Sequence, residues 1–152
     1  MLIIIEKICS DELLTACREQ LAEAGWQSGK VTAGPLAVSV KHNQQSVETP
    51  AMLALADLIR RTVSQHPKFI SAVLPLHITR PRFNRYAGGG HYGTHVDGAI
   101  MPQPGTTQLL RSDLSVTLFL CEPDEYDGGE LIIETKFGAQ QIKLAAGDLV
   151  LY

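Results

Sequence analysis

The sequence predicts an α+β fold in which helices pack on one face of an antiparallel β-sandwich or barrel. Of its 152 residues, 45% are hydrophobic and 19% are charged, which is typical of one domain with a buried core. Apolar residues recur at helical spacing in the first half of the chain, whereas short apolar or alternating runs follow Pro75. No helical pattern separates those later runs, so we expect antiparallel strands rather than a parallel βαβ arrangement.

The first half begins with a strand and two helices. The apolar run over residues 2–8 predicts a strand, and Ser10 is a typical N-cap for a helix whose first turn is acidic. Gly25 is the expected stop of this helix, and Thr49 and Pro50 are the expected start of the second. The positions expected to face the core are Leu13, Leu14, Cys17, Leu21 and Ala24, followed in the second helix by Leu53, Ala56, Ile59 and Val63.

The second half carries five segments with strand signals, most of them bounded by glycine. They are HITRPRFNRYA, DLSVTLFLCE, GELIIETKF, AQQIKLA and GDLVLY. Residues 98–111, between the first two segments, hold two prolines and two glycines without a clear period. We expect a long loop there, either an active-site lid or a plain surface connection.

Charge and cysteine content restrict the classes of function. The net charge is -3 and the isoelectric point is about 5.9, without runs of basic residues, so we do not expect a nucleic acid as partner. The three cysteines, Cys9, Cys17 and Cys121, form no C-x-x-C pair, which favours reduced thiols and a cytoplasmic location. The opening MLIIIEKIC is short and has no basic leader, so we expect a strand and no membrane partner.

The stretch RYAGGGHYGTHVDGAIM supports two competing hypotheses. Gly88, Gly90 and Gly93 match G-x-G-x-x-G, the pattern of a nucleotide-binding loop, and a strand precedes them. A dinucleotide site also needs a helix directly after the glycines, whose N-terminus holds the pyrophosphate. The residues that follow are THVDGAIMPQPG, which have no helical pattern and contain two prolines. The nucleotide hypothesis therefore has little support.

The second hypothesis is a metal site at His95 and Asp97. On a strand, side chains two residues apart point to the same face with Cα atoms roughly 6.5–7 Å apart, so an imidazole and a carboxylate can converge on one ion. A single H-x-D pair arises by chance in roughly one such sequence in four. The alternative is a turn histidine beside a turn aspartate with no ligand.

The order of the later motifs favours the metal site. The segments FNRYAGGGHYGTHVDGAI, LRSDLSVTLFLCEPDEYDGGELII and AAGDLVLY, in this order, resemble the PKHD-type hydroxylases, which are prolyl-hydroxylase-like oxygenases dependent on iron(II) and 2-oxoglutarate. The N-terminal part, including GWQSGKVTAG, resembles that family as well. The resemblance implies a double-stranded β-helix, or jelly roll. We expect residues 1–75 to support the core and residues 76–152 to form the jelly roll, as one compact domain overall.

The resemblance also implies an activity and its residues. His95 and Asp97 would supply two ligands of a 2-His-1-carboxylate triad for iron(II), and Tyr86 would reach the carboxylate of 2-oxoglutarate. The implied reaction hydroxylates a C–H bond of a small-molecule or peptidyl substrate and converts 2-oxoglutarate to succinate and CO2, with L-ascorbate as a reductant.

The chain departs from the family pattern near its end. No histidine follows His95, although the family's second histidine ligand comes after the GDLVLY strand and a 2-oxoglutarate-binding arginine comes later. His91 matches no family ligand, and Arg111 resembles part of the R-x-D-L-S motif rather than that arginine. We therefore expect a truncated chain with an incomplete barrel, whose exposed edge at GDLVLY favours self-association. The alternative is a non-catalytic sensor or interaction module with an incomplete metal site.

Overall fold

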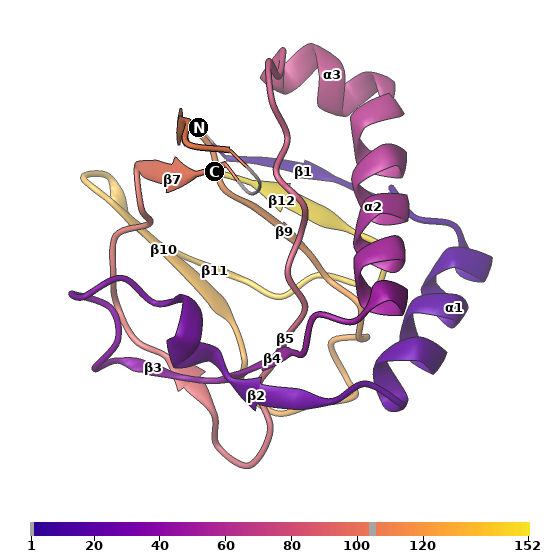
Figure 1. Ribbon diagram of the computed structural model, residues 1–152, viewed down its shortest axis with the longest axis horizontal. Helices are drawn as coiled ribbons and strands as arrows, with labels where there is room; N and C mark the ends of the chain where they lie inside the picture. Colours follow the sequence, from indigo (N-terminus) through magenta and orange to yellow (C-terminus); the bar gives the residue numbers. More distant parts are fainter. Residues whose placement is uncertain (1, 104–105) are drawn as a thin grey trace.

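The computed structural model describes residues 2–103 and 106–152, which form an α+β arrangement of helices and small antiparallel sheets (Figure 1). The helices lie along one side and the strands fill the other (Figure 1). No helix in the described part of the chain is both long and apolar enough to cross a membrane. The helices are α1 (Asp11–Ala22), α2 (Pro50–Gln65) and α3 (Pro67–Val73), with a short 3-10 helix at Gly29–Thr32. The strands are β1 (Ile3–Ile5), β2 (Trp26–Ser28), β3 (Lys41–His42), β4 (Gln44–Ser46), β5 (Asn84–Arg85), β6 (His91–Tyr92), β7 (Ile100–Pro102), β8 (Leu109–Arg111), β9 (Val116–Leu118), β10 (Leu131–Thr135), β11 (Gly138–Ile142) and β12 (Leu149–Leu151).

The strands pair antiparallel in sheets of two or three, and strands from the two ends of the chain meet. The sheet orders are β1-β12-β9, β2-β4-β5, β3-β6, β7-β8 and β10-β11. In the first sheet Ile3 faces Leu151 and Ile5 faces Leu149, so β12 is the central strand, paired on both sides. The exposed edge expected at GDLVLY is therefore wrong, because β1 and β9 both cover β12. Self-association, which we inferred from that edge, stays untested.

The helix starts follow the sequence prediction, but one stop does not. The Ser10 hydroxyl accepts a hydrogen bond from the Leu13 amide at 3.3 Å, and Thr49 caps α2 in the same way. Helix α1 ends at Ala22 with Glu23 as its C-cap, so the prediction that Gly25 stops it is wrong. The Gly25 carbonyl instead accepts a hydrogen bond from the Val47 amide at 2.8 Å.

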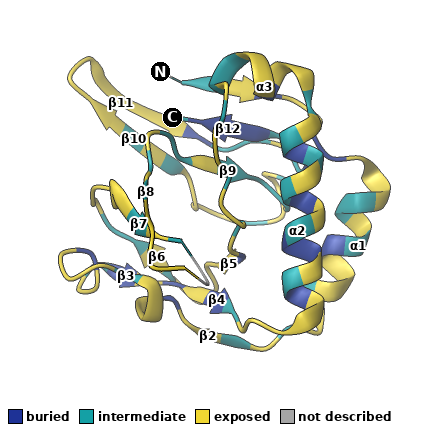
Figure 2. Cartoon of the chain, turned by 45° about the horizontal axis from the view of Figure 1, so that its top comes forward, coloured by how far each residue is buried: buried dark blue, intermediate teal, exposed yellow. Residues whose placement is uncertain are grey.

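The core lies between α2 and the β1-β12-β9 sheet. Leu149, Val150 and Leu151 of β12 have no exposed surface (Figure 2, dark blue). Burying a leucine side chain stabilises the fold by roughly 1.5–3 kcal/mol. The buried stripe of α2 is shifted from the predicted one, because Leu53 is only partly buried. The stripe consists of Met52, Leu55, Ala56, Ile59 and Val63.

The later strands are confirmed in four of the five predicted segments, as β9, β10, β11 and β12. Segment HITRPRFNRYA is mostly irregular and contributes only the short β5. The loop expected over residues 98–111 is instead a hairpin, in which Ile100 of β7 faces Arg111 of β8. Pro102 is compatible with it because each strand of a two-stranded sheet has an edge where no amide donor is needed. Residues 104–105 of this segment lie outside the described residues.

Candidate metal centre

The glycine run serves a tight turn and close strand packing. Gly88 and Gly89 have φ values of 59° and 80°, a left-handed conformation that glycine adopts without strain. A side chain on Gly90 would place its Cβ 2.9 Å from the His42 carbonyl oxygen, and one on Gly93 would lie 3.0 Å from the Val40 Cβ. The glycines therefore let β6 lie directly against β3. No helix follows them in residues 94–103, so the nucleotide hypothesis has no structural support.

His95 and Asp97 come together, although not on a strand as the sequence argument assumed. They lie in the irregular stretch between β6 and β7, where alternation along a strand does not orient them. Even so, His95 Nε2 and Asp97 Oδ1 are 3.3 Å apart. The side chains are 24% and 52% exposed, so the pair lies at the surface and is open to a ligand.

The hydrogen bond on the other ring nitrogen determines what His95 can bind. Nδ1 lies 2.7 Å from the Gly93 carbonyl oxygen, which only accepts, so Nδ1 carries the hydrogen and donates it. In the neutral ring Nε2 then has a free lone pair that faces a carboxylate oxygen. Two such lone pairs repel each other unless a cation lies between them or the ring is protonated. One imidazole nitrogen oriented by a backbone carbonyl, with a carboxylate oxygen beside it, fits a divalent metal ion.

Two neighbouring residues hold this pair in place. The Ser115 hydroxyl donates a hydrogen bond to Asp97 Oδ2, which leaves Oδ1 on the side of His95. The Tyr92 ring stacks on the His95 ring with centroids 3.6 Å apart and planes 11° apart. Burial raises the pKa of Tyr92, and the charge of Asp97 raises it further. Neither residue was singled out from the sequence, and the only signal was that each lies within a segment that resembles the family.

Tyr86 follows β5 and is 51% exposed. Burial of its phenol raises the pKa of Tyr86, whereas a hydrogen bond with Asn43 lowers it. The phenol lies near that of Tyr92, whose pKa it raises. No contact among the described residues tests the role in 2-oxoglutarate binding, which stays a prediction.

Other residues considered as ligands or anchors have contacts of their own. His91 faces His42 across the β3–β6 ladder, with ring centroids 4.8 Å apart. Arg111 forms an exposed ion pair with Asp113 at 2.7 Å. Among the described residues, no group of three histidine, cysteine, aspartate or glutamate side chains could hold a metal ion. His95 and Asp97 are therefore the candidate ligands that the described part of the chain offers.

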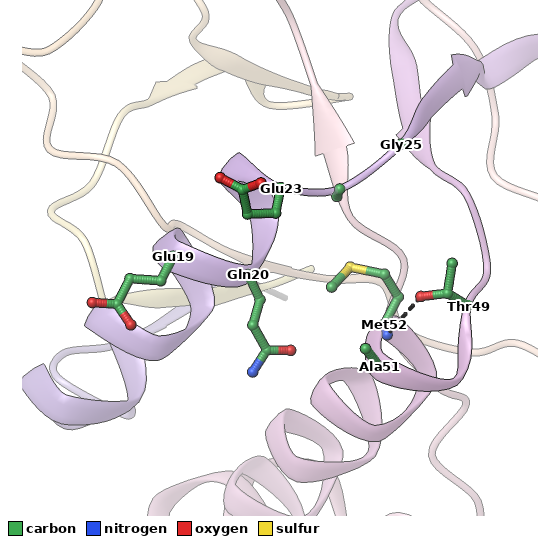
Figure 3. A pocket seen from close by; sticks show the side chains of 8 residues that line it. Glu19, Gln20, Glu23, Gly25, Thr49, Ala51 and Met52 are labelled. Carbon is green, nitrogen blue, oxygen red and sulfur yellow. Dashed lines mark hydrogen bonds between the residues drawn. The ribbon is translucent and has the colours of Figure 1, made fainter.

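A surface pocket of about 380 Å³ lies elsewhere, between the end of α1 and the start of α2 (Figure 3). Glu19, Glu23 and Met52 line it, together with Thr49. The Thr49 hydroxyl there accepts the Met52 amide hydrogen as the cap of α2. This pocket contains neither His95 nor Asp97, so it is separate from the candidate metal centre.

Comparison with known proteins assigns the family. Residues 81–152 match the model of the 2OG-Fe(II) oxygenase superfamily. Over its whole length the chain is 48% identical to a PKHD-type hydroxylase of Parvibaculum lavamentivorans and 49% identical to one of Delftia acidovorans, and it spans 68% of each. It is 54% identical to a PKHD-type hydroxylase of Acidovorax ebreus, of which it spans 67%. The chain belongs to the PKHD-type hydroxylases, a family of iron(II)- and 2-oxoglutarate-dependent oxygenases.

Proposed function

We propose that His95 and Asp97 bind the iron(II) of this hydroxylase and that Tyr86 contacts 2-oxoglutarate. The observation that supports the metal ligands most is the 3.3 Å approach of His95 Nε2 to Asp97 Oδ1, with the other imidazole nitrogen held by the Gly93 carbonyl. When bound, iron(II) would activate O2, which is the oxidant for C–H hydroxylation, and 2-oxoglutarate would supply two of the electrons that reduce it. The balanced reaction consumes the substrate C–H, 2-oxoglutarate and O2, and yields the C–OH product, succinate and CO2.

The chain's own residues have positioning roles in this proposal. The Gly93 carbonyl fixes the tautomer and direction of the imidazole, while Ser115 fixes the direction of the carboxylate. The Tyr92 ring covers one face of His95 and restricts its rotation. The phenol of Tyr86, half-exposed near Tyr92, is available to donate a hydrogen bond to a carboxylate of 2-oxoglutarate.

The finer fold, location and partners are also proposals. Residues 76–152 would form a jelly roll supported by residues 1–75, because all pairings between the described strands are antiparallel and β1, β3 and β4 pair with strands of the later segment. Three cysteines without disulfide partners support a cytoplasmic location. The substrate is a small molecule or a peptidyl side chain, and L-ascorbate is the reductant that the family suggests.

Iron binding and succinate production test the proposal in separate steps. Anaerobic calorimetry should show one iron(II) per chain, and this binding should be lost in His95→Ala and Asp97→Ala but kept in His77→Ala, a matched change of an exposed histidine. In a version of the chain extended to the length of its relatives, NMR should detect succinate from oxygen and 2-oxoglutarate, and His77→Ala in that version should retain this activity. Iron binding that survives His95→Ala would contradict the assignment of the metal ligands.

A further inference from the structure

Two histidines face each other across the β3–β6 ladder, on the side of the molecule away from the helices (Figure 2). His42 is paired with His91 in the register of these strands, and both residues are exposed. Their ring centroids are 4.8 Å apart, with 36° between the ring planes. Residues directly opposite each other in an antiparallel pair have Cβ atoms about 4.5–5.5 Å apart. The two imidazoles are therefore close enough to contact one ligand together.

A backbone carbonyl holds one ring nitrogen of each histidine. His42 Nε2 lies 3.0 Å from the Ser39 carbonyl oxygen, and His91 Nδ1 lies 3.3 Å from the Gly89 carbonyl oxygen. A carbonyl oxygen only accepts, so each of these nitrogens carries the hydrogen and donates it. In the neutral rings His42 Nδ1 and His91 Nε2 then have free lone pairs. Histidines that bind metals almost always donate their other ring N–H in this way, which fixes the tautomer and the ring direction.

The two free nitrogens have no protein partner within residues 2–103 and 106–152. In this part of the chain the hydrogen bonds of both rings are the two with backbone carbonyls. No aspartate or glutamate oxygen there lies within 4.0 Å of a nitrogen of either ring. The pair therefore offers two neutral nitrogen donors, without a carboxylate beside them.

The separation of the rings fits two ligands of one metal ion. Bonds from a metal to histidine nitrogen are about 2.0–2.1 Å long, which puts the ion roughly 3.2 Å from each ring centre. Two such ligands at an N–metal–N angle between square-planar and tetrahedral geometry have ring centres roughly 4.5–5.2 Å apart. The observed 4.8 Å lies within this interval. An aromatic contact without a metal accounts for the same distance, so a binding measurement must decide between the two explanations.

The donor atoms restrict which ion fits. Imidazole nitrogen suits nickel(II), copper(II) and zinc(II), whereas magnesium and calcium require oxygen ligands. Affinity at nitrogen sites rises from iron(II) through nickel(II) to copper(II), so the pair should bind iron(II) less tightly than either of the other two. The His95–Asp97 centre differs in kind, because it combines an imidazole with a carboxylate.

We propose that His42 Nδ1 and His91 Nε2 form a second metal site, which binds one divalent ion of the group nickel, copper and zinc. Water would complete the coordination, because the described residues supply no third ligand. The ion would link β3 to β6 in addition to their backbone pairing. Tyr92, the next residue of β6, stacks on His95, so the ion would also fix the strand that supports the first centre. The site uses neither His95 nor Asp97 and does not depend on the proposed function.

Nickel(II) calorimetry tests the site, because nickel(II) binds imidazole and, unlike copper(II), does not oxidise thiols such as the exposed Cys121. The titrated protein is His95→Ala, in which the first centre has lost its imidazole, and it should bind one nickel(II) per chain. Adding His42→Asn or His91→Asn should weaken this binding at least about 100-fold, because a second ligand held nearby raises affinity by about 10²–10⁴. His77→Asn, at another exposed histidine, is the matched control and should leave the binding unchanged.

Two further measurements distinguish a shared ion from separate weak ligands. In NMR titrations of His95→Ala with zinc(II), the imidazole signals of His42 and His91 should shift together, at the same metal concentration, while those of His77 should not. With nickel(II) at about 100 times its dissociation constant, the midpoint of thermal unfolding should rise by about 5–10 °C, because the ion binds the folded chain only. Adding His42→Asn should remove this rise.

The outcomes that would overturn the site are clear-cut. Nickel(II) affinity that is the same with and without His42→Asn would leave a plain aromatic contact between the rings. A loss of affinity in only one of the two histidine variants would also contradict the inference, because both imidazoles must contact the ion. Both residues are exposed, so the substitutions should leave the urea midpoint of the metal-free chain unchanged. None of these results changes the assignment of His95 and Asp97, which iron(II) binding tests separately.

Discussion

The hydrogen bond from Ser115 to Asp97 predicts that removing the Ser115 hydroxyl weakens metal binding. Ser115 would have this effect through Asp97, without contacting the metal. Ser115 donates to Asp97 Oδ2, and its backbone is held separately by two hydrogen bonds with Tyr152 at 2.8 and 3.0 Å. Ser115→Ala therefore removes one hydrogen bond to a carboxylate without disturbing the chain. The carboxylate would then rotate freely and have to be ordered when the metal binds.

The expected loss of metal-binding free energy is at the lower end of what a hydrogen bond to a charged group usually contributes. A hydrogen bond to a charged group contributes about 1.5–3 kcal/mol, but Asp97 is 52% exposed, so water replaces part of the lost bond. We expect a loss of about 1.4 kcal/mol, which is roughly tenfold in the dissociation constant and agrees with the usual effect of residues that orient metal ligands.

Zinc calorimetry measures this directly. Ser112→Ala is the matched control, because Ser112 lies three residues away and its hydroxyl makes no hydrogen bond among the described residues. Ser115→Ala should bind zinc about tenfold more weakly than Ser112→Ala, with the same stoichiometry. Equal affinities in the two variants would refute the positioning role, and a loss as large as that of His95→Ala would mean that the serine affects more than the direction of Asp97.

Three further predictions concern the scaffold. Leu151→Ala should lower the free energy of unfolding by about 2–5 kcal/mol in urea titrations, whereas Ile132→Ala, at a side chain 53% exposed, should cost less than about 1 kcal/mol. Gly89→Ala should lower thermal stability by about 1–2 kcal/mol because φ is 80°, and Gly34→Ala, with open space around it, should change much less. Burial raises the pKa of Cys9 from 9.0 to about 11, so the folded state binds the thiol proton more tightly than the unfolded state does. The stability that this contributes is complete below pH 9 and falls by about 2–3 kcal/mol as pH rises toward 11. A Cys9→Ala variant should lose less stability over that window, and identical pH profiles would contradict the assignment.

Local signals predicted the helix starts, whereas the features that the sequence missed arise from pairing between distant strands. Ser10 and Thr49 are caps that act within three residues, so the sequence suffices to locate them. The buried face of Lys41, Asn43 and Gln45 could not be predicted, because its polar residues resemble a solvent-exposed loop. Their burial depends on pairing with strands about 40 to 50 residues later in the chain, β5 and β6, in addition to the nearby β2.

The glycine run connects the pairing of β3 and β6 with the position of His95. In the sequence these glycines matched a nucleotide-binding pattern, but in the structure Gly90 and Gly93 allow close strand packing. Their missing side chains let β6 approach the backbone of His42 and Val40 on the neighbouring strand segment. That approach sets Tyr92 opposite Lys41, and Tyr92 in turn stacks on His95. The glycines therefore set the distance between β3 and β6, and a side chain at Gly90 or Gly93 would push apart the strands that place Tyr92 against His95.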